Sequence, residues 1–304
     1  MVYSPLMGVH PHRRRAGARA ALIAAALLGS APAARAAEPR IDTPSAGEVE
    51  RTLPAGESLT GKEIYDRFLR NRRKLRTARQ EGRILSRDPG GNPQETRFEL
   101  RAKDYRDADE QPVDGIYSKT VIQLMGPYEI RWSGYLYVHR ADRADDQYSY
   151  APSRRRVSRI SLKGQSLAGT DFSFDDFLVS VDDIEDADYE RRPDEVFQGV
   201  AVYVVEATMK PDARSRYTRT ISYVEKEHYV PLRTRYFDRG VEVKDLVSPH
   251  EKIKDFDGAW VPTESRMTDI LEGTSSTMHL DRLDPNPTFD DHDFNLSVLL
   301  EQRS

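Results

Sequence analysis

The chain has 304 residues, a formal net charge of -4 and no cysteine. The length suits one large domain or two small ones, and the charge balance excludes the basic excess of a nucleic-acid-binding protein. The missing cysteine excludes disulfides, thiolate metal sites, cysteine nucleophiles and a lipid anchor on an N-terminal cysteine.

Residues 1–36 are predicted to be a signal peptide that is removed. The cluster Arg13–Arg15 precedes a short apolar stretch, Ala20–Leu28, and Ala34-Arg35-Ala36 supplies the small residues that signal peptidase recognises. The apolar stretch is shorter than the roughly 20 residues that a membrane-spanning helix needs. Cleavage removes only arginines from the charge count and leaves a net charge of about -9. We therefore expect an acidic periplasmic protein that has neither a transmembrane segment nor a lipid anchor.

Residues 37–59 are predicted to be a flexible linker, because prolines recur among polar residues, and residues 60–304 to be one domain. Thr60 and Glu63 have the spacing of a helix-capping box. Ile64, Phe68 and Leu69 then follow at helical spacing, so the sequence predicts an amphipathic helix of roughly four turns.

After Gln80 the apolar residues alternate with polar ones, which is typical of strands. The expected strands are Arg83–Ser86, Thr96–Leu100, Thr120–Met125, Tyr128–Val138, Tyr148–Ile160 with a break near Pro152, Gly199–Met209, Tyr217–Val224, Pro231–Phe237, Val241–Val247, His250–Asp255, Trp260–Asp269 and Ser275–Leu283. Short turns between them indicate an antiparallel meander, and the fold class is α+β with mainly antiparallel β-structure.

Aromatic side chains occupy alternate positions in three segments, and each pair therefore lies on one face of its segment. The pairs are Tyr135 with Tyr137, Tyr148 with Tyr150, and Phe172 with Phe174. A single helix cannot cover the apolar face of about ten strands. The sheet either closes or curls around an apolar pocket that the helices plug, or else it encloses a fully packed core.

Charged clusters allow two interpretations. Arg154, Arg155, Arg156 and Arg159 suit a docking patch for phosphate head groups or an acidic partner, or a charged sheet edge that resists aggregation. The acidic runs 182–188 and 290–293 are interpreted as solvated loops. Gly164–Gly169 misses the spacing of a nucleophile elbow by one residue, and the histidines lack metal-site spacing. We expect no enzyme, no cofactor and no metal.

One long block resembles a known family. Tyr148–Ile160 reads YSYAPSRRRVSRI, and Leu167–Phe177 reads LAGTDFSFDDF. The block is similar to the signature of the LolA-like outer-membrane lipoprotein-sorting family. Ala151 replaces the usual leucine, and the last four residues replace Tyr-Glu-Asp-Leu. Further agreement at 203–207, 223–233 and 257–263 extends the resemblance over residues 60–298.

The resemblance implies a curved, incomplete β-barrel of about ten or eleven strands, with helices plugging its concave face. It also implies a soluble periplasmic carrier that holds the acyl chains of a lipid or lipoprotein and moves them towards the outer membrane. Expected partners are an inner-membrane RND/MMPL-type transporter and an outer-membrane acceptor. The alternatives are an accessory protein of such an exporter that carries no cargo and, less in keeping with the sequence, a lipid hydrolase.

Gly164–Leu178 is the expected lid of the cavity, because it is bounded by glycine and carries apolar residues at helical spacing. The residues expected to line the cavity and lid are Trp132, Tyr135, Tyr137, Tyr148, Tyr150, Phe172, Phe174, Phe177 and Leu178.

Overall fold

The structure is a computed structural model that describes residues 50–53, 58–87, 91–162, 164–177, 181–211, 213 and 215–301. The chain divides into two units, Met1–Thr43 and Pro44–Ser304. The expected signal peptide and Leu178 lie outside the described residues. No helix in the described ranges is long and apolar enough to cross a membrane.

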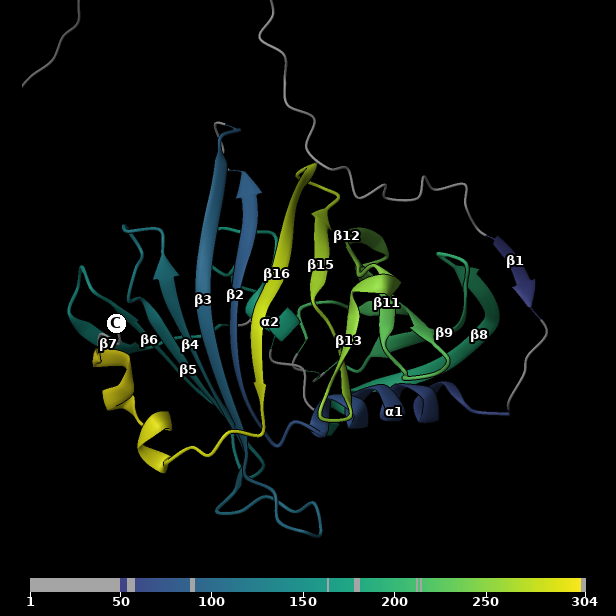
Figure 1. Ribbon diagram of the computed structural model, residues 1–304. Coiled ribbons are helices and arrows are strands. Elements are labelled where there is room, and N and C mark those ends of the chain that lie inside the picture. The colour runs from purple at the N-terminus through teal and green to yellow at the C-terminus, as the bar shows by residue number, and fades with distance from the viewer. Residues whose placement is uncertain are drawn as a thin grey trace, which may run out of the picture. The chain divides into compact units, whose positions relative to one another are not determined.

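One antiparallel sheet of 14 strands dominates the second unit (Figure 1). Its order is β1-β8-β9-β10-β11-β12-β15-β16-β2-β3-β4-β5-β6-β7. The strands are β1 (Glu50–Leu53), β2 (Thr77–Arg87), β3 (Pro93–Asp104), β4 (Ile116–Gly126), β5 (Gly134–Arg140), β6 (Asp146–Ala151), β7 (Arg156–Arg159), β8 (Ala187–Phe197), β9 (Val200–Met209), β10 (Arg219–Glu225), β11 (Pro231–Asp238), β12 (Val241–Val247), β15 (Glu264–Asp269) and β16 (Thr274–Pro285). Within the described residues β1 and β7 are different edges, so the curved barrel is open.

A small hairpin of β13 (Ile253–Phe256) and β14 (Ala259–Pro262) lies outside this sheet. It is fixed to helix α1 (Gly61–Arg73) through the buried side chain of Asn71. The Asn71 amide donates to the Trp260 carbonyl at 2.7 Å and accepts from the Trp260 N–H at 3.0 Å. One polar side chain thus satisfies two backbone groups of β14.

The capping box of α1 is confirmed. Thr60 accepts from the Glu63 N–H at 3.2 Å, and the Glu63 carboxylate accepts from the Thr60 N–H at 2.7 Å. The buried Ile64 packs against Tyr203 and Val205 of β9. These contacts lay α1 across one face of the sheet, which we call the inner face.

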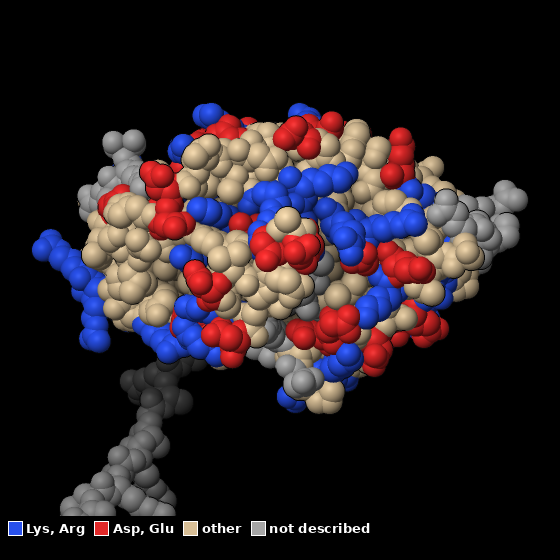
Figure 2. Space-filling model, turned by 90° about the horizontal axis from the view of Figure 1, so that it is seen from below, with Lys and Arg blue, Asp and Glu red and all other residues tan. Residues whose placement is uncertain are grey.

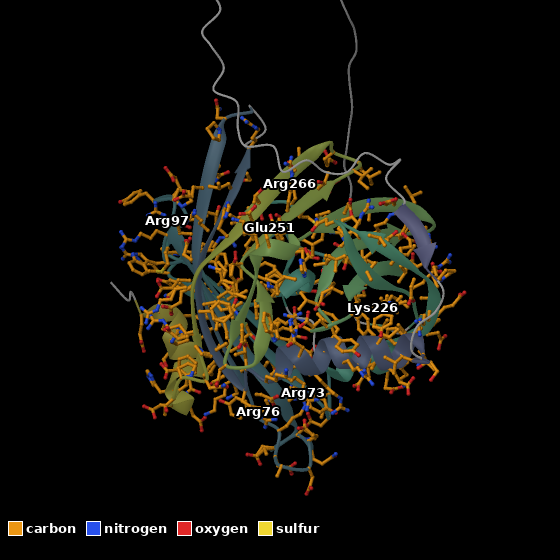
Figure 3. The ribbon with its side chains drawn as sticks, turned by 45° about the vertical axis from the view of Figure 1, so that its right-hand side comes forward. Arg73, Arg76, Arg97, Lys226, Glu251 and Arg266 are labelled. Atoms are coloured by element: carbon orange, nitrogen blue, oxygen red, sulfur yellow. The ribbon has the colours of Figure 1, made fainter. Side chains whose placement is uncertain are left out.

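Opposite charges are mixed on the side of the molecule where α1 lies (Figure 2). Arg70 pairs with Asp66 within the helix at 2.6 Å. Figure 3 shows Arg73 and Arg76 at the lower end of the molecule, and both pair with Glu110 of the β3–β4 loop. The cations at the C-terminal end of the helix therefore attach α1 to the β3–β4 loop, and they also interact favourably with the helix dipole.

The opposite, outer face has two kinds of cover. Over β4 to β6, the short 3₁₀ helices η3 (Asp291–Phe294) and η4 (Leu296–Leu300) pack three buried apolar residues, Phe294, Val298 and Leu299, against the sheet. Over β10 and β11, arginines lie on aromatic rings, and the Arg219 guanidinium is 3.9 Å from the ring centre of Phe237. A guanidinium stacks on an aromatic face and keeps its polar edge in water.

Several sequence predictions of the elements need correction. The expected strand His250–Asp255 begins as the 3₁₀ helix η2 (His250–Lys252), and the expected strand Trp260–Asp269 is divided between β14 of the hairpin and β15 of the large sheet. The sheet has 14 strands rather than ten or eleven, because β8 was missed and β1 lies within the expected linker. Strand β8 carries six charged residues among eleven and so lacks an apolar alternation. The expected strand from Tyr128 begins only at Gly134, since Gly126–Ser133 form a turn that includes a cis Gly126–Pro127 bond.

Candidate functional site

The inner face over β2 to β5 is covered by residues 164–177, which we call the lid segment. Its side chains Leu167, Phe172 and Phe174 are almost wholly buried against the sheet. The apolar residues beneath them come mainly from neighbouring strands and include Ile84, Phe98, Leu100, Ile122 and Leu124. The ring of Phe174 lies 4.6 Å from the ring of Tyr135. The lid segment therefore covers the apolar residues of the inner face in this structure.

The lid segment folds upon itself as a small hairpin. The Leu167 N–H donates to the Phe172 carbonyl at 2.8 Å, and the Phe174 N–H donates to the Gln165 carbonyl at 3.1 Å. Both residues of its turn, Ala168 and Gly169, have left-handed backbone angles, which suit a tight hairpin turn. Helix α2 (Phe174–Phe177) follows as a single turn. These two backbone hydrogen bonds are internal to the segment and give it a local fold of its own.

Polar bonds from Asp171 fasten the lid segment to the sheet. Its backbone N–H donates to the Ser276 hydroxyl at 3.0 Å, and that hydroxyl donates to its carboxylate at 2.5 Å. Thr274 donates to the same carboxylate, and the buried Lys244 ammonium donates to the Asp171 carbonyl. We call these four residues the latch. Polar bonds of this kind exchange with water at little net cost, so a latch holds a segment without making its release prohibitive.

Two tyrosines form a polar floor between the lid segment and α1. The rings of Tyr217 and Tyr236 lie 4.5 Å apart. Burial raises the pKa of Tyr236 well above its ordinary value, and the Asp176 carboxylate adds to the rise. Tyr65 and Arg72 of α1 also influence this pKa, and Tyr236 packs against the inner cluster. The floor combines aromatic bodies with hydroxyl tips, which suits the boundary between an apolar chain and its polar end.

Asp176 is the acidic group of this floor. Burial raises its pKa above the ordinary 3.8, although the Ser173 N–H at 2.6 Å and hydroxyl at 2.9 Å stabilise the charged form. Its second carboxylate oxygen, Oδ1, is buried and has no hydrogen-bond partner among the described residues. The charged carboxylate is thus under-solvated in the closed arrangement.

We expect Asp176→Asn to raise the melting temperature at pH 7 and to flatten its pH dependence. A carboxyl group whose folded pKa is raised destabilises the fold once it ionises, so its effect is absent at low pH and grows as pH rises through the raised pKa. Melting curves between pH 4 and pH 8 measure the difference. A variant whose curve runs parallel to that of the parent would contradict this role of Asp176.

The predicted cavity residues divide between the two faces of the sheet. Tyr135, Tyr137, Phe172 and Phe174 lie together in the inner cluster, and their role in lining a cavity stays a prediction. Tyr148 and Tyr150 pack instead in the outer cluster beneath the C-terminal helices. The register explains this correction, because Tyr148 pairs with Leu136, whose side chain points away from the inner face. Trp132 lies in the β4–β5 turn, α2 ends at Phe177, and Leu178 is outside the described residues.

The predicted arginine cluster lies in the hairpin of β6 and β7, at one edge of the sheet. Arg154, Arg155, Arg156 and Arg159 are all exposed. Arg159 pairs with Asp146 at 3.0 Å, so it also has a structural role. The position agrees with the protection of an edge strand, and a docking role for the cluster stays a prediction.

Sequence reasoning missed the latch and the tyrosine floor. Asp171 stands inside the block that resembles the LolA-like signature, but its partners Lys244 and Ser276 are distant in sequence. Only the sheet order, which places β12, β15 and β16 side by side, brings them together. Among the described residues no group of three or more His, Asp or Glu side chains could hold a metal ion.

Known proteins resemble the chain in fold and, in part, in sequence. A family model described as "Uncharacterized protein" matches residues 117–301. A solved domain from Vibrio parahaemolyticus, described as an outer membrane lipoprotein-sorting protein, is 24% identical with a TM-score of 0.67, covering 79% of this chain and 98% of that one. A DUF1329 family protein from Desulfovibrio piger is 25% identical with a TM-score of 0.69, covering 79% and 99%. A LolA superfamily protein from Nitrosomonas europaea is 16% identical with a TM-score of 0.59, covering 79% and 100%. No curated protein matches the sequence.

Proposed function

We propose that this chain, which belongs to the LolA-like family, is a periplasmic carrier. It binds the acyl chains of a lipid or lipoprotein on the inner face of its sheet. The observation that supports this proposal is the construction of the inner face. A broad apolar surface over β2 to β5 is covered by one short segment that folds on itself and is fastened by polar bonds.

The energetics suit reversible loading. Burying an acyl chain gains about 0.8 kcal/mol per CH₂, so a single long chain binds reversibly and two bind tightly. The side chains of Phe172 and Phe174 occupy the same surface in the closed arrangement. Cargo therefore competes with the lid segment rather than entering an empty hollow, and this competition limits the affinity to a range from which release is possible.

The route of the cargo completes the proposal. Residues 1–36 direct export and are removed, and the carrier receives cargo from an RND/MMPL-type transporter in the inner membrane and delivers it to an outer-membrane acceptor. The alternative is an accessory protein of such an exporter, which uses the same sheet for protein contacts. The chain is proposed to perform no chemistry.

Organic extraction of the purified protein, followed by mass spectrometry, tests the carrier against the accessory protein. A carrier is expected to release a lipid or lipid-modified species in a defined ratio to protein. The matched control is the same protein with the lid segment held closed, as described in the Discussion, and it should release none. Parent protein that yields no lipid after purification from its native periplasm, and that takes up no fluorescent fatty acid, would contradict the carrier function.

A further inference from the structure

The alternating strand directions gather several turns at one edge of the sheet. All neighbouring strands are antiparallel, so the β2–β3, β4–β5, β6–β7, β11–β12 and β15–β16 turns must lie at the same end of their strands. We call this end the upper rim, and Figure 1 shows the end of β2, the start of β3 and the β15–β16 turn at its top. The β3–β4 loop and α1 lie at the lower rim.

Exposed apolar side chains concentrate on the upper rim. Among the described residues, eight large apolar side chains are exposed, and five of them lie in or beside upper-rim turns. These five are Leu85, Tyr128, Val241, Ile270 and Leu271. Tyr128 is 88% exposed and Leu271 is 65% exposed. Scattered apolar residues need no explanation, but a set on one edge indicates an interaction surface.

The β15–β16 and β4–β5 turns do not depend on their exposed apolar side chains for folding. In the β15–β16 turn the Asp269 carboxylate accepts from the N–H groups of Leu271 and Glu272, each at 3.0 Å. In the β4–β5 turn it is Ile130, not Tyr128, that packs against the inner cluster. The exposed tips are therefore available to a partner.

Charge on the upper rim favours an anionic partner. The described exposed charges of the β2–β3, β4–β5, β6–β7 and β15–β16 turns are Arg87, Arg131, Arg154, Arg155, Glu129 and Glu272. Arginine is thus in excess, although the whole chain is acidic. Apolar tips between arginines fit a membrane interface, where the tips enter the acyl boundary and the guanidinium groups meet lipid phosphates.

We propose that the upper rim docks on the surface of an anionic lipid bilayer, with Tyr128, Ile270 and Leu271 as the inserted side chains. This inference deepens the carrier function and rests on it for its purpose. The latch stands next to the rim, because Thr274 and Ser276 begin the strand that follows the Ile270–Leu271 turn. A docked carrier would therefore hold its lid segment beside the lipids that it loads or delivers.

Vesicle co-sedimentation of the purified protein tests the docking. We expect binding to vesicles of phosphatidylglycerol and phosphatidylethanolamine, with affinity about tenfold lower for phosphatidylcholine vesicles or at high salt. Ile270→Ser with Leu271→Ser should weaken binding to the anionic vesicles about tenfold, and Tyr128→Ser should weaken it further. The matched control is Val113→Ser, since Val113 is 44% exposed in the β3–β4 loop at the lower rim, and it should bind like the parent.

A second readout reports insertion directly. The chain has only two tryptophans, and one of them, Trp132, stands in the β4–β5 turn near Tyr128. Trp260 lies near α1 instead, where its ring stacks on His228 at 3.6 Å. In a Trp260→Phe variant the emission of Trp132 should shift to the blue when anionic vesicles are added.

Failure of the docking and failure of the carrier function give different results. Parent protein that binds no anionic vesicles, or a Val113→Ser variant that loses as much binding as the rim variants, would overturn the docking. A protein that contacts only a transporter would give the first of these results. Uptake of a soluble fluorescent fatty acid by the rim variants, equal to that of the parent, would leave the carrier function intact.

Discussion

Joining the lid segment to the sheet by a disulfide is expected to abolish uptake of a fluorescent fatty acid, and reduction is expected to restore it. The pair is Asp171→Cys with Ser276→Cys, whose native side-chain oxygens lie 2.5 Å apart. These two positions face each other across the contact between the lid segment and the sheet, as a disulfide bond requires. The chain contains no cysteine of its own, so no other disulfide can form within one molecule. Oxidised protein cannot lift the lid segment, and the acyl chain cannot displace Phe172 and Phe174 from the inner face.

Each sample of this variant serves as its own control, because oxidised and reduced protein share one sequence. Single variants Asp171→Cys and Ser276→Cys lack the latch bond but cannot be locked, and both should take up ligand with or without reductant. Equal fatty-acid uptake by the oxidised and reduced double variant would show that the ligand binds elsewhere. That result would contradict the hypothesis that residues 164–177 act as a lid.

Local signals in the sequence predicted most of the fold. The α1 helix follows from a capping box and an apolar stripe that are complete within thirteen residues. The strands between Gly199 and Val247 follow from alternation between short turns, and they agree with β9 to β12 of the structure. Strand β8 was missed because its pattern is mostly charged, and its assignment depends on pairing with β9 and β1. A strand of this kind forms because of its pairing with neighbouring strands, and its own sequence pattern does not reveal those neighbours.

The site was predictable only in part, because alternation shows that two residues share a face but not which face it is. Tyr135 and Tyr148 belong to equally aromatic segments, yet the hydrogen-bonded register sends them to opposite sides of the sheet. The sequence also showed too few signs of the segments and side chains that cover the outer face of the sheet. The C-terminal 3₁₀ helices and the arginines stacked on Phe237 shield apolar surface that the sequence argument left for a cavity. The number of predicted helices therefore does not show whether the sheet encloses an apolar cavity. The carrier hypothesis depends instead on the lid segment being removable.

Replacing Phe174 by alanine should tighten fatty-acid binding about tenfold. The side chain is 1% exposed and packs on Tyr135 in the closed arrangement. Burial of such a ring contributes about 1.5–3 kcal/mol to closure, and a loss of about 1.4 kcal/mol is already tenfold in the population that can bind. Titration with a fluorescent fatty acid measures the affinity, and urea unfolding of the same sample measures stability.

The matched control for this change is Phe294→Ala. Phe294 is also 1% exposed, but it belongs to the C-terminal helix η3 and packs on the outer face of the sheet. Its removal should lower the free energy of unfolding by about 3–5 kcal/mol, as is usual for a phenylalanine in a fixed core, and leave fatty-acid affinity unchanged. Phe174→Ala should cost less stability than Phe294→Ala, since a lid segment can move to close the space left behind. If both variants lose the same stability and neither changes affinity, Phe174 belongs to a permanent core, and the inner face has no removable cover at this position.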